Sequence, residues 1–374
     1  MIFFILLLGL GLRLINLNQS LWLDEAISFL AVKNYNFFDI ITKFSPGDVH
    51  PPLYYLILKF WTNFFGFSEI ALRFPSVIAG VLAVFVIYKI GGKVPALFLA
   101  VNPLAIYYSQ EARMYSLAML LVLLAVSFFL KGKKLWFIIF LALAFYTDYI
   151  PWLIFPVFLP LSFLVFIFLA PWSLTMWQQF QANVLLAREV PLWGQVVGGF
   201  SFKALELVPI KFIFGRIPAH LIFALPTVFY GWILTKTKNR FLWSWLLIPI
   251  FLGFLISFKI PIFTYHRFLF VLPAFILLLA EGVKNSIKVI MFIIFISFIS
   301  LMIFNLNPRF WRENWRAATA YINSDPGKVV MPNLAQSASL TYYGAKMNTK
   351  NNPVYLIRYV QEVFDPEDTE RKFL

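Results

Sequence analysis

Leu21-Trp22-Leu23-Asp24-Glu25 begins a polar island in an otherwise apolar sequence. The island ends with Gly47-Asp48-Val49-His50-Pro51-Pro52-Leu53. Four ionisable side chains, those of Asp24, Glu25, Asp48 and His50, thus lie in one loop between two hydrophobic segments. Ionisable groups in a membrane-embedded chain are costly and usually functional. Asp24 and Glu25 could also cap a helix, since carboxylates there bind free amides and favour the helix dipole. Capping does not explain Asp48 and His50, so the island is predicted to be a functional site.

The composition around this island is that of a membrane protein. Of the 374 residues, 61% are hydrophobic, 20% are aromatic and only 13% are charged, whereas soluble domains contain about 25% charged residues. The mean hydropathy is +0.80. The net charge of +14 arises from short Lys/Arg clusters between apolar runs, which indicates membrane topology and argues against nucleic-acid binding. With no cysteine, disulfides and thiolate chemistry are excluded. The predicted fold class is an all-α polytopic membrane protein.

Basic turns set the predicted orientation. Four turns are predicted to be cytoplasmic, at residues 91–93, 131–134, 236–240 and 284–288, because positive charge is retained on that side. At about 20 apolar residues per full span, we expect about nine to eleven transmembrane helices. Amphipathic helices are expected in the outer loops, and the first outer loop covers about residues 16–69. Arg13 is expected near the outer end of the first span.

Residues 151–170 leave two paths open, because Pro156 and Pro160 break this apolar run. One straight span would place residues 172–216 in the cytoplasm, whereas two short helices that double back would leave them outside. The later basic turns favour the doubled-back path, since it keeps all four of them on one side.

The last segment changes character. Trp311–Ala318 is amphipathic, Lys328–Pro332 is predicted to be a buried strand, and Ser337–Tyr343 suits either a strand or a short helix. A folded segment of this size has marginal stability alone, so it is expected to pack against the membrane part. The predicted division is a transmembrane catalytic domain, residues 1–304, followed by a small extracytoplasmic α/β appendage, residues 305–374.

Ionisable residues from several loops are predicted to meet on the outer face. They are Asp24, Glu25, Asp48, His50, Arg73, Glu111, Arg113, Asp148, His266 and Arg267. A carboxylate can take a proton from an attacking hydroxyl, and arginines can hold a phosphate by paired hydrogen bonds. A site at membrane level implies a lipid-linked substrate. Local roles are the alternative: Glu69 with Arg73, or Glu111 with Arg113, could form simple ion pairs, and Asp148 could end a helix.

Four motifs in the first third of the chain carry a family resemblance. They are Trp22-Leu23-Asp24-Glu25-Ala26, Asp48-Val49-His50-Pro51-Pro52-Leu53-Tyr54-Tyr55, Ser68-Glu69-Ile70-Ala71-Leu72-Arg73-Phe74-Pro75-Ser76, and Asn102-Pro103 with Tyr108-Ser109-Gln110-Glu111-Ala112-Arg113-Met114-Tyr115. In order and spacing they resemble the GT-C class glycosyltransferases of the protein O-mannosyltransferase and aminoarabinose transferase group (glycosyltransferase family 39-like). Tyr265-His266-Arg267-Phe268 is a weaker match.

The resemblance implies an inverting glycosyltransferase in the cell membrane. Such an enzyme moves a hexose or pentose from a polyprenyl-phosphate donor to an acceptor on the extracytoplasmic face. Asp24 matches the candidate catalytic base, and Glu25 matches the neighbour that orients the acceptor or the loop. The residues assigned to substrate binding are Asp48, His50, Arg73, Glu111, Arg113, Tyr115, Tyr265, His266 and Arg267. The acceptor stays open between a glycan, a lipid and a protein of the cell envelope.

Two further interpretations remain. A divalent metal ion could be held by Asp24, Asp48 and His50; no other cofactor is expected. A polytopic transporter or lipid flippase could use the same charges as a substrate path. That alternative predicts paired broken helices in two related halves and a site at the midplane, neither of which the sequence indicates. The transferase is therefore the preferred interpretation.

Overall fold

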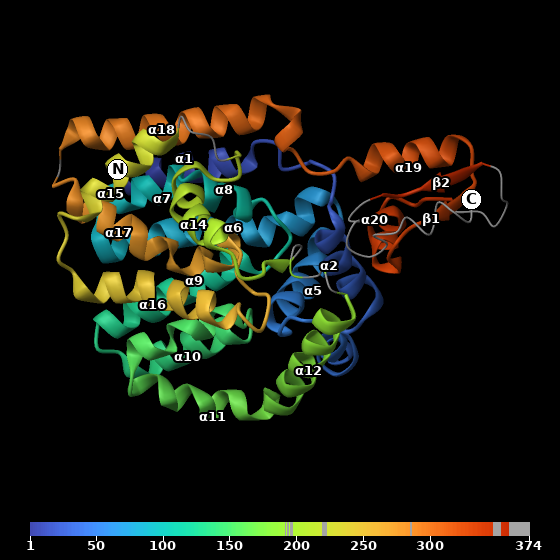
Figure 1. Cartoon of the computed structure of the whole chain (residues 1–374), viewed down its shortest axis with the longest axis horizontal. Helices are drawn as coiled ribbons and strands as arrows, with labels where there is room; N and C mark the ends of the chain where they lie inside the picture. Colours follow the sequence, from blue (N-terminus) through green and yellow to red (C-terminus); the bar gives the residue numbers. More distant parts are fainter. Residues whose placement is uncertain are drawn as a thin grey trace.

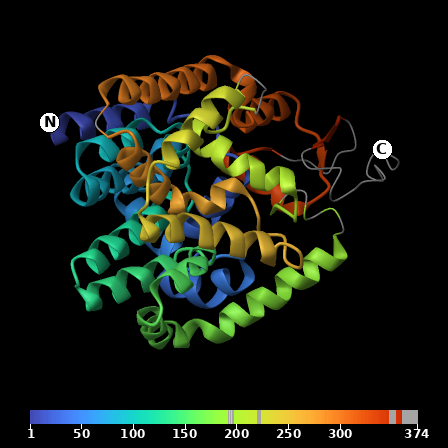
Figure 2. The same ribbon diagram turned by 60° about the vertical axis from the view of Figure 1, so that its left-hand side comes forward.

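The structure is a computed structural model that describes residues 1–190, 192, 194, 197–218, 223–284, 286–346 and 353–358. Figure 1 shows long helices stacked side by side in a bundle, with the N-terminus at one end of it and a smaller C-terminal part beside the other end. Figure 2, turned by 60°, shows the same arrangement from the side of the bundle.

Among the described residues, the bundle contains ten helices. They are α1 (Ile2–Leu14), α6 (Glu69–Gly91), α7 (Lys93–Val101), α8 (Pro103–Ser109), α9 (Tyr115–Leu130), α10 (Lys134–Phe145), α15 (Ala224–Leu234), α16 (Arg240–Ile256), α17 (Leu272–Gly282) and α18 (Ile287–Leu306). In the described part of the chain, four helical stretches are long and apolar enough to cross a membrane, and five shorter apolar helices accompany them. The predicted class, an all-α polytopic membrane protein, is confirmed.

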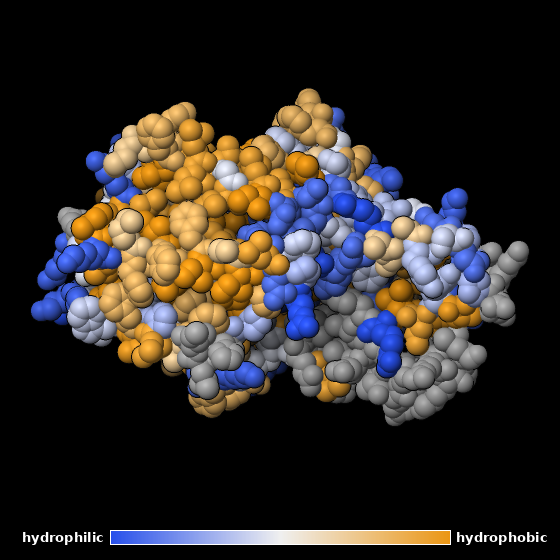
Figure 3. Space-filling view, turned by 90° about the horizontal axis from the view of Figure 1, so that it is seen from above, coloured by the Kyte–Doolittle hydropathy of each residue, from blue (hydrophilic) through white to orange (hydrophobic). Residues whose placement is uncertain are grey.

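The basic turns meet at one end of the bundle, here called the basic end. Gly91 and Asn239, from two of these turns, border one hollow together with Leu130 and Glu281, which lie just before the other two turns. The opposite end, here called the site end, carries the first loop. Figure 3 shows a broad apolar surface over the bundle between hydrophilic surfaces at either side, which suits a protein that spans a bilayer.

The chain doubles back after α10. This stretch contains η2 (Ile150–Phe158), η3 (Leu161–Leu164), α11 (Val165–Leu169), η4 (Ala170–Trp172) and α12 (Ser173–Glu189). Phe158, the last residue of η2, packs against Phe129 and Phe241 near the basic end. Trp172, at the end of the return path, donates a hydrogen bond to Tyr149 Oη at the site end, 2.7 Å away. The chain therefore follows the doubled-back path that the later basic turns favoured.

The first loop folds as a series of short helices at the site end. They are α2 (Leu23–Asn34), α3 (Phe37–Asp39), the π-helix η1 (Ile40–Phe44), α4 (Ser45–Gly47) and α5 (Leu53–Phe65). In α5, Tyr54, Leu58 and Thr62 are buried while Phe60 and Phe64 are exposed, so the helix is amphipathic. Two later elements also lie at this end: α14 (Phe202–Phe214) and the 3₁₀ helix η6 (Tyr265–Val271).

The C-terminal part is a small α/β unit. It contains η7 (Pro308–Phe310), α19 (Trp315–Ser324), β1 (Lys328–Val330), η8 (Leu334–Gln336), α20 (Ser337–Tyr342) and β2 (Val354–Leu356). The two strands pair in parallel, and Trp315, Ile322 and Leu340 form a small core. The strand predicted at Lys328–Pro332 is confirmed for its first three residues, and the segment predicted at Ser337–Tyr343 is a helix as far as Tyr342.

This C-terminal unit packs against the first loop. The ring of Tyr342 lies 4.8 Å from that of Phe29 in α2. Glu69, at the start of α6, binds Arg316 at 2.6 Å and accepts a hydrogen bond from Tyr343 Oη at 3.0 Å. The unit thus has the support that its small core requires.

Arg13 lies near the site end of α1, but its side chain is fully buried. Its guanidinium donates to Ser109 Oγ at 3.1 Å and to the Ala100 carbonyl at 3.1 Å. Gly80 of α6 makes room for these contacts, because a Cβ there would lie 2.1 Å from Ser109 Oγ and 2.8 Å from Arg13 Nε. Four helices, α1, α6, α7 and α8, thus meet at this buried cation.

Candidate active site

Glu25 and Arg73 form a buried ion pair that ties α2 to α6. Arg73 Nε and Nη2 donate to the two carboxylate oxygens of Glu25 at 2.7 and 2.6 Å, and both side chains are 0% exposed. The remaining Arg73 donors bind the carbonyls of Leu17, Gln19 and Ser20 at 2.6–3.0 Å. All five N–H groups of this arginine are therefore used inside the protein, and none is left to hold a substrate phosphate.

Glu25 also contacts two other segments of the chain. The Ala112 N–H donates to Glu25 Oε1 at 2.8 Å, and Arg312 Nε lies 3.5 Å from Glu25 Oε2. Burial opposes ionisation of Glu25, but the charges of Arg73 and Arg312 outweigh it and lower the pKa of its carboxyl. Glu25 is thus a buried structural carboxylate, in contrast to its neighbour Asp24.

Glu111 is a buried carboxylate of the second loop. Its side chain is 1% exposed, and Arg312 Nη2 lies 3.5 Å from Glu111 Oε2. Burial raises the pKa of Glu111 to about 7, against the opposing charge of Arg312. Neither simple ion pair considered from the sequence forms: Arg73 binds Glu25 instead of Glu69, and Glu111 faces Arg312 while the Arg113 side chain points elsewhere.

Arg113 brings Asp24 and His50 together. Arg113 Nη2 lies 3.8 Å from Asp24 Oδ2 and 2.7 Å from His50 Nε2. A guanidinium has only donors, so His50 Nε2 accepts and the imidazole is neutral. Burial and the charges of Arg113 and Arg267 lower the pKa of His50 well below its usual range, in agreement with that neutral form.

Asp24 is the most open of the acidic groups in this ion-pair cluster. Its side chain is 34% exposed, against 0% for Glu25 and 1% for Glu111. Removal of water by the surrounding protein raises the pKa of Asp24, and the charge of Arg113 partly opposes this. Asp24 is therefore an accessible carboxylate with increased basicity, which are the two properties that a general base needs.

Asp48 is held within the first loop. Tyr55 Oη donates to Asp48 Oδ2 at 2.6 Å and lies 3.3 Å from Arg113 Nη1. Gln179 of α12 donates to the Asp48 carbonyl at 2.9 Å, and its side-chain oxygen accepts a hydrogen bond from Tyr149 Oη. The 2%-exposed Gln179 thus joins the return path of the doubled-back stretch to the loop that carries His50.

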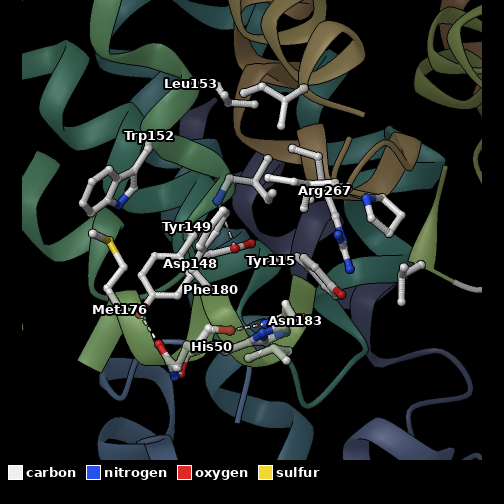
Figure 4. A pocket seen from close by; sticks show the side chains of 18 residues that line it. His50, Tyr115, Asp148, Tyr149, Trp152, Leu153, Met176, Phe180, Asn183 and Arg267 are labelled. Atoms are coloured by element: carbon white, nitrogen blue, oxygen red, sulfur yellow. Dashed lines mark hydrogen bonds between the residues drawn. The ribbon is translucent and has the colours of Figure 1, made fainter. Parts of the chain in front are cut away.

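A cavity of about 320 Å³ opens beside this cluster. Its polar lining includes His50, Tyr115, Asp148 and Arg267, which come from four separate segments (Figure 4). The remaining lining is mostly apolar, with Ile150, Trp152, Leu153, Phe180, Ile256 and Ile262 among its members. A mostly apolar cavity with a few convergent polar groups is the usual form of a ligand site.

Asp148 and Arg267 supply opposite charges to this cavity. Asp148 Oδ1 accepts a hydrogen bond from the Ile150 N–H at 3.2 Å, and burial raises the pKa of the carboxyl. Within the described residues, the Arg267 guanidinium has no hydrogen bond or ion pair, although its charge acts on Asp24, His50 and Asp148. As far as the described residues go, the Arg267 guanidinium is therefore available to bind an anionic ligand.

His266 and Tyr265 lie differently from Arg267. The His266 ring packs against those of Tyr108 and Tyr115, with centroids 5.4 and 5.1 Å apart. Tyr265 borders another hollow, beside Gly198. Of the residues assigned to substrate binding, the structure brings His50, Arg113, Tyr115, His266 and Arg267 together with Asp24, and it places Tyr265 and Arg73 away from the cavity.

The described residues do not support the predicted metal site. No group of three or more His, Asp or Glu side chains among them is arranged to hold a metal ion. The position that such an ion would take is filled by the guanidinium of Arg113, which lies between Asp24 and His50. Asp48 points instead to Tyr55. The charge balance of this group is thus provided by arginine.

Three residues of the site were missed in the sequence interpretation. Gln179 fastens the return path, Arg216 Nη1 donates to Tyr107 Oη at 2.9 Å, and Arg312 reaches Glu25 and Glu111 from the C-terminal segment. Trp311-Arg312 was visible only as part of an amphipathic run. Its partners lie about 200 and 290 positions away in sequence, a separation that local patterns do not reveal.

The fold and site define a polytopic α-helical membrane protein with a charged, partly enclosed site at one end of its bundle. No protein-family model and no curated protein sequence matches the chain. Among solved structures, it is similar to ArnT from Cupriavidus metallidurans bound to undecaprenyl phosphate, with a TM-score of 0.59 and 11% identity over 92% of this chain and 84% of that one. This likeness confirms the GT-C fold that the motifs predicted.

The raised pKa of Glu111 has a consequence for stability. A carboxyl that binds its proton more tightly when folded stabilises the protein below its ordinary pKa, and that stability is lost as pH rises through about 7. We expect Glu111→Gln to increase the melting temperature relative to the parent protein at pH 8 and to change it less at pH 5. Thermal unfolding of both proteins in detergent at the two pH values measures this. A larger gain at pH 5 than at pH 8 would contradict the assignment.

Proposed function

We propose that this protein is a membrane glycosyltransferase that moves a sugar from a polyprenyl-phosphate donor to an acceptor, with Asp24 as the catalytic base. The observation that carries this proposal is the arrangement around the cavity. An accessible carboxylate, Asp24, lies 3.8 Å from Arg113. Arg267, whose guanidinium has no partner among the described residues, shares a mostly apolar cavity with His50. The GT-C fold shared with a protein bound to undecaprenyl phosphate supports the same donor class.

The proposed reaction is a single displacement. The acceptor hydroxyl oxygen attacks the anomeric carbon of the donor, and the bond from that carbon to the phosphate oxygen breaks. Asp24 takes the hydroxyl proton, and the polyprenyl phosphate leaves with the bonding electron pair. The leaving group is already stable as an anion, so no acid is required to protonate it, in contrast to glycoside hydrolysis. In-line attack inverts the anomeric configuration.

Arginines supply the second requirement, which is to bind the phosphate charge. Arg267 lines the cavity at the start of η6, and its guanidinium has no hydrogen bond or ion pair to the described residues. Arg113 already binds His50 and serves mainly to orient the Asp24 carboxylate. The apolar lining suits the first isoprene units of the donor. We propose that this reaction takes place on the extracytoplasmic face, because the basic end matches the cytoplasmic side.

The test uses purified protein in liposomes. The donors are undecaprenyl-phosphate hexoses and pentoses, and the acceptors are glycolipids extracted from cells that lack the protein. We expect one donor to transfer its sugar, seen by mass spectrometry as a gain of one sugar mass on the acceptor. Donor movement between leaflets without any change of mass would indicate a flippase instead, and would overturn the proposal.

The role of Arg267 gives a separate prediction. Lysine keeps the charge but loses the planar fork that binds two phosphate oxygens. We expect Arg267→Lys to weaken binding of undecaprenyl phosphate, or to slow transfer, by about tenfold or more, as loss of a charge-assisted hydrogen bond of about 1.5–3 kcal/mol implies. Titration of the purified protein with undecaprenyl phosphate measures the affinity.

A matched control for this variant is Arg240→Lys. Arg240 begins α16 at the basic end and is exposed, so the same substitution there should leave the affinity for undecaprenyl phosphate unchanged. If Arg267→Lys binds undecaprenyl phosphate and turns over as the parent protein does, Arg267 lies at the membrane interface without holding the phosphate.

A further inference from the structure

The C-terminal part of the chain reaches the candidate active site through Arg312, which lies between α18 and α19. The Arg312 side chain is 3% exposed, and its guanidinium lies over the ring of Tyr107, 4.6 Å from the ring centroid. Its main-chain N–H donates to Gln19 Oε1 at 3.3 Å. Burying an arginine side chain costs desolvation free energy, which opposite charges and hydrogen-bond acceptors nearby must offset.

The partners of Arg312 come from the two segments that carry the proposed reaction. Its Nε lies 3.5 Å from Glu25 Oε2, and its Nη2 lies 3.5 Å from Glu111 Oε2 and donates to the Gln110 carbonyl at 2.9 Å. Glu25 directly follows Asp24 in the first turn of α2. Glu111 precedes Arg113 in the second loop, and its carbonyl accepts the Arg113 N–H at 2.8 Å. The Arg312 side chain thus contacts both the first turn of α2 and the second loop.

We propose that Arg312 is a positioning residue of the transfer reaction: it holds the Asp24 turn of α2 against the Arg113 loop, so that Asp24 and Arg113 keep their 3.8 Å separation. This inference rests on the proposed function. The Arg312 side chain is 3% exposed, and its guanidinium faces the carboxylates of Glu25 and Glu111, so it acts through these two groups and does not touch the substrate. The C-terminal segment then contributes a positioning residue to the active site.

A positioning role and a purely structural role differ in what they do to Asp24. The charged groups that act on Asp24 are Arg113, Asp48, Arg267 and Glu25. Without Arg312, the second loop is free to shift, and Asp24 loses its nearest cation. Asp24 should then hold its proton to higher pH. A merely structural loss would lower the amount of folded protein and leave the pH dependence of the remaining enzyme unchanged.

The experiment compares Arg312→Met with Arg316→Met in the full-length protein, using the liposome assay described above. Arg316 lies one helical turn further along, and its side chain is 52% exposed beside Glu69. For Arg312→Met we expect kcat to fall by about 10- to 100-fold, the size of effect that a small misplacement of a catalytic group produces, with KM changed much less. The acid limb of its pH–rate profile should move to higher pH. Arg316→Met should match the parent protein in all three quantities.

If the methionine variant does not fold, Arg312→Lys is measured in its place. Lysine supplies the charge without a fork that spans two carboxylates, so we expect an intermediate kcat and a smaller shift of the acid limb. Parent-like kcat and pH profile in either variant would overturn the positioning role, as would a lower kcat with an unmoved acid limb. Absence of transfer by the parent protein itself would instead refute the proposed function.

Discussion

Asp24→Asn is expected to lose transfer activity by about 10²- to 10⁴-fold, the usual contribution of a positioned general base. The amide keeps the size of the side chain, and Glu25, not Asp24, makes the buried contacts of this turn. Membrane insertion and the melting temperature should therefore stay close to those of the parent protein. Transfer assays in liposomes, with the melting temperature measured on the same preparation, test this expectation.

The pH dependence adds a second measurement. The pKa of Asp24 is raised, and the carboxyl must be ionised to accept a proton. The activity of the parent protein should thus rise with pH through an acid limb that lies above the ordinary aspartate pKa of about 3.9, and Asp24→Asn should lack that limb. Asp39→Asn is the matched control, since Asp39 pairs with Lys43 on the surface of the same loop. Activity of Asp24→Asn within a few-fold of the parent would exclude Asp24 as the base.

Local sequence patterns were sufficient for the membrane fold and for the first half of the site. Apolar runs indicate the helices of the bundle, and basic turns indicate which turns share one end of it, so the helices and the doubled-back path followed from these patterns. The Asp24, His50 and Arg113 group was also predictable, because motifs in two loops carry it. In each case the signal lies within a short stretch of the chain.

The partner of each charge was not predictable in the same way. Glu69 and Arg73 have helical i,i+4 spacing, yet each binds a group elsewhere in the chain, Arg316 and Glu25 respectively. A buried guanidinium gains most where carbonyls and a carboxylate converge on its five donors, and that convergence exists only after the first loop has folded over α6. Arg312 and Gln179 were not predicted for the same reason: their partners come close only in the folded chain.

Arg73→Met is expected to have the largest effect on stability. It removes the bidentate contact to Glu25 and three hydrogen bonds to main-chain carbonyls, and it leaves a buried carboxylate with Arg312 as its remaining cation at 3.5 Å. Removing one member of a buried pair costs about 3–5 kcal/mol. We therefore expect a large fall in melting temperature and loss of folded protein at physiological temperature.

Two comparisons separate this structural role from the substrate-binding role first predicted for Arg73. Arg316→Met removes a surface ion pair, worth about 1 kcal/mol or less, and should change the melting temperature little. The double variant Glu25→Gln with Arg73→Met should be less destabilised than the sum of the two single variants, because glutamine leaves no uncompensated charge and can still accept the Ala112 N–H. If Arg73→Met instead melts like the parent protein and binds undecaprenyl phosphate more weakly, then Arg73 holds the donor and its buried contacts contribute little.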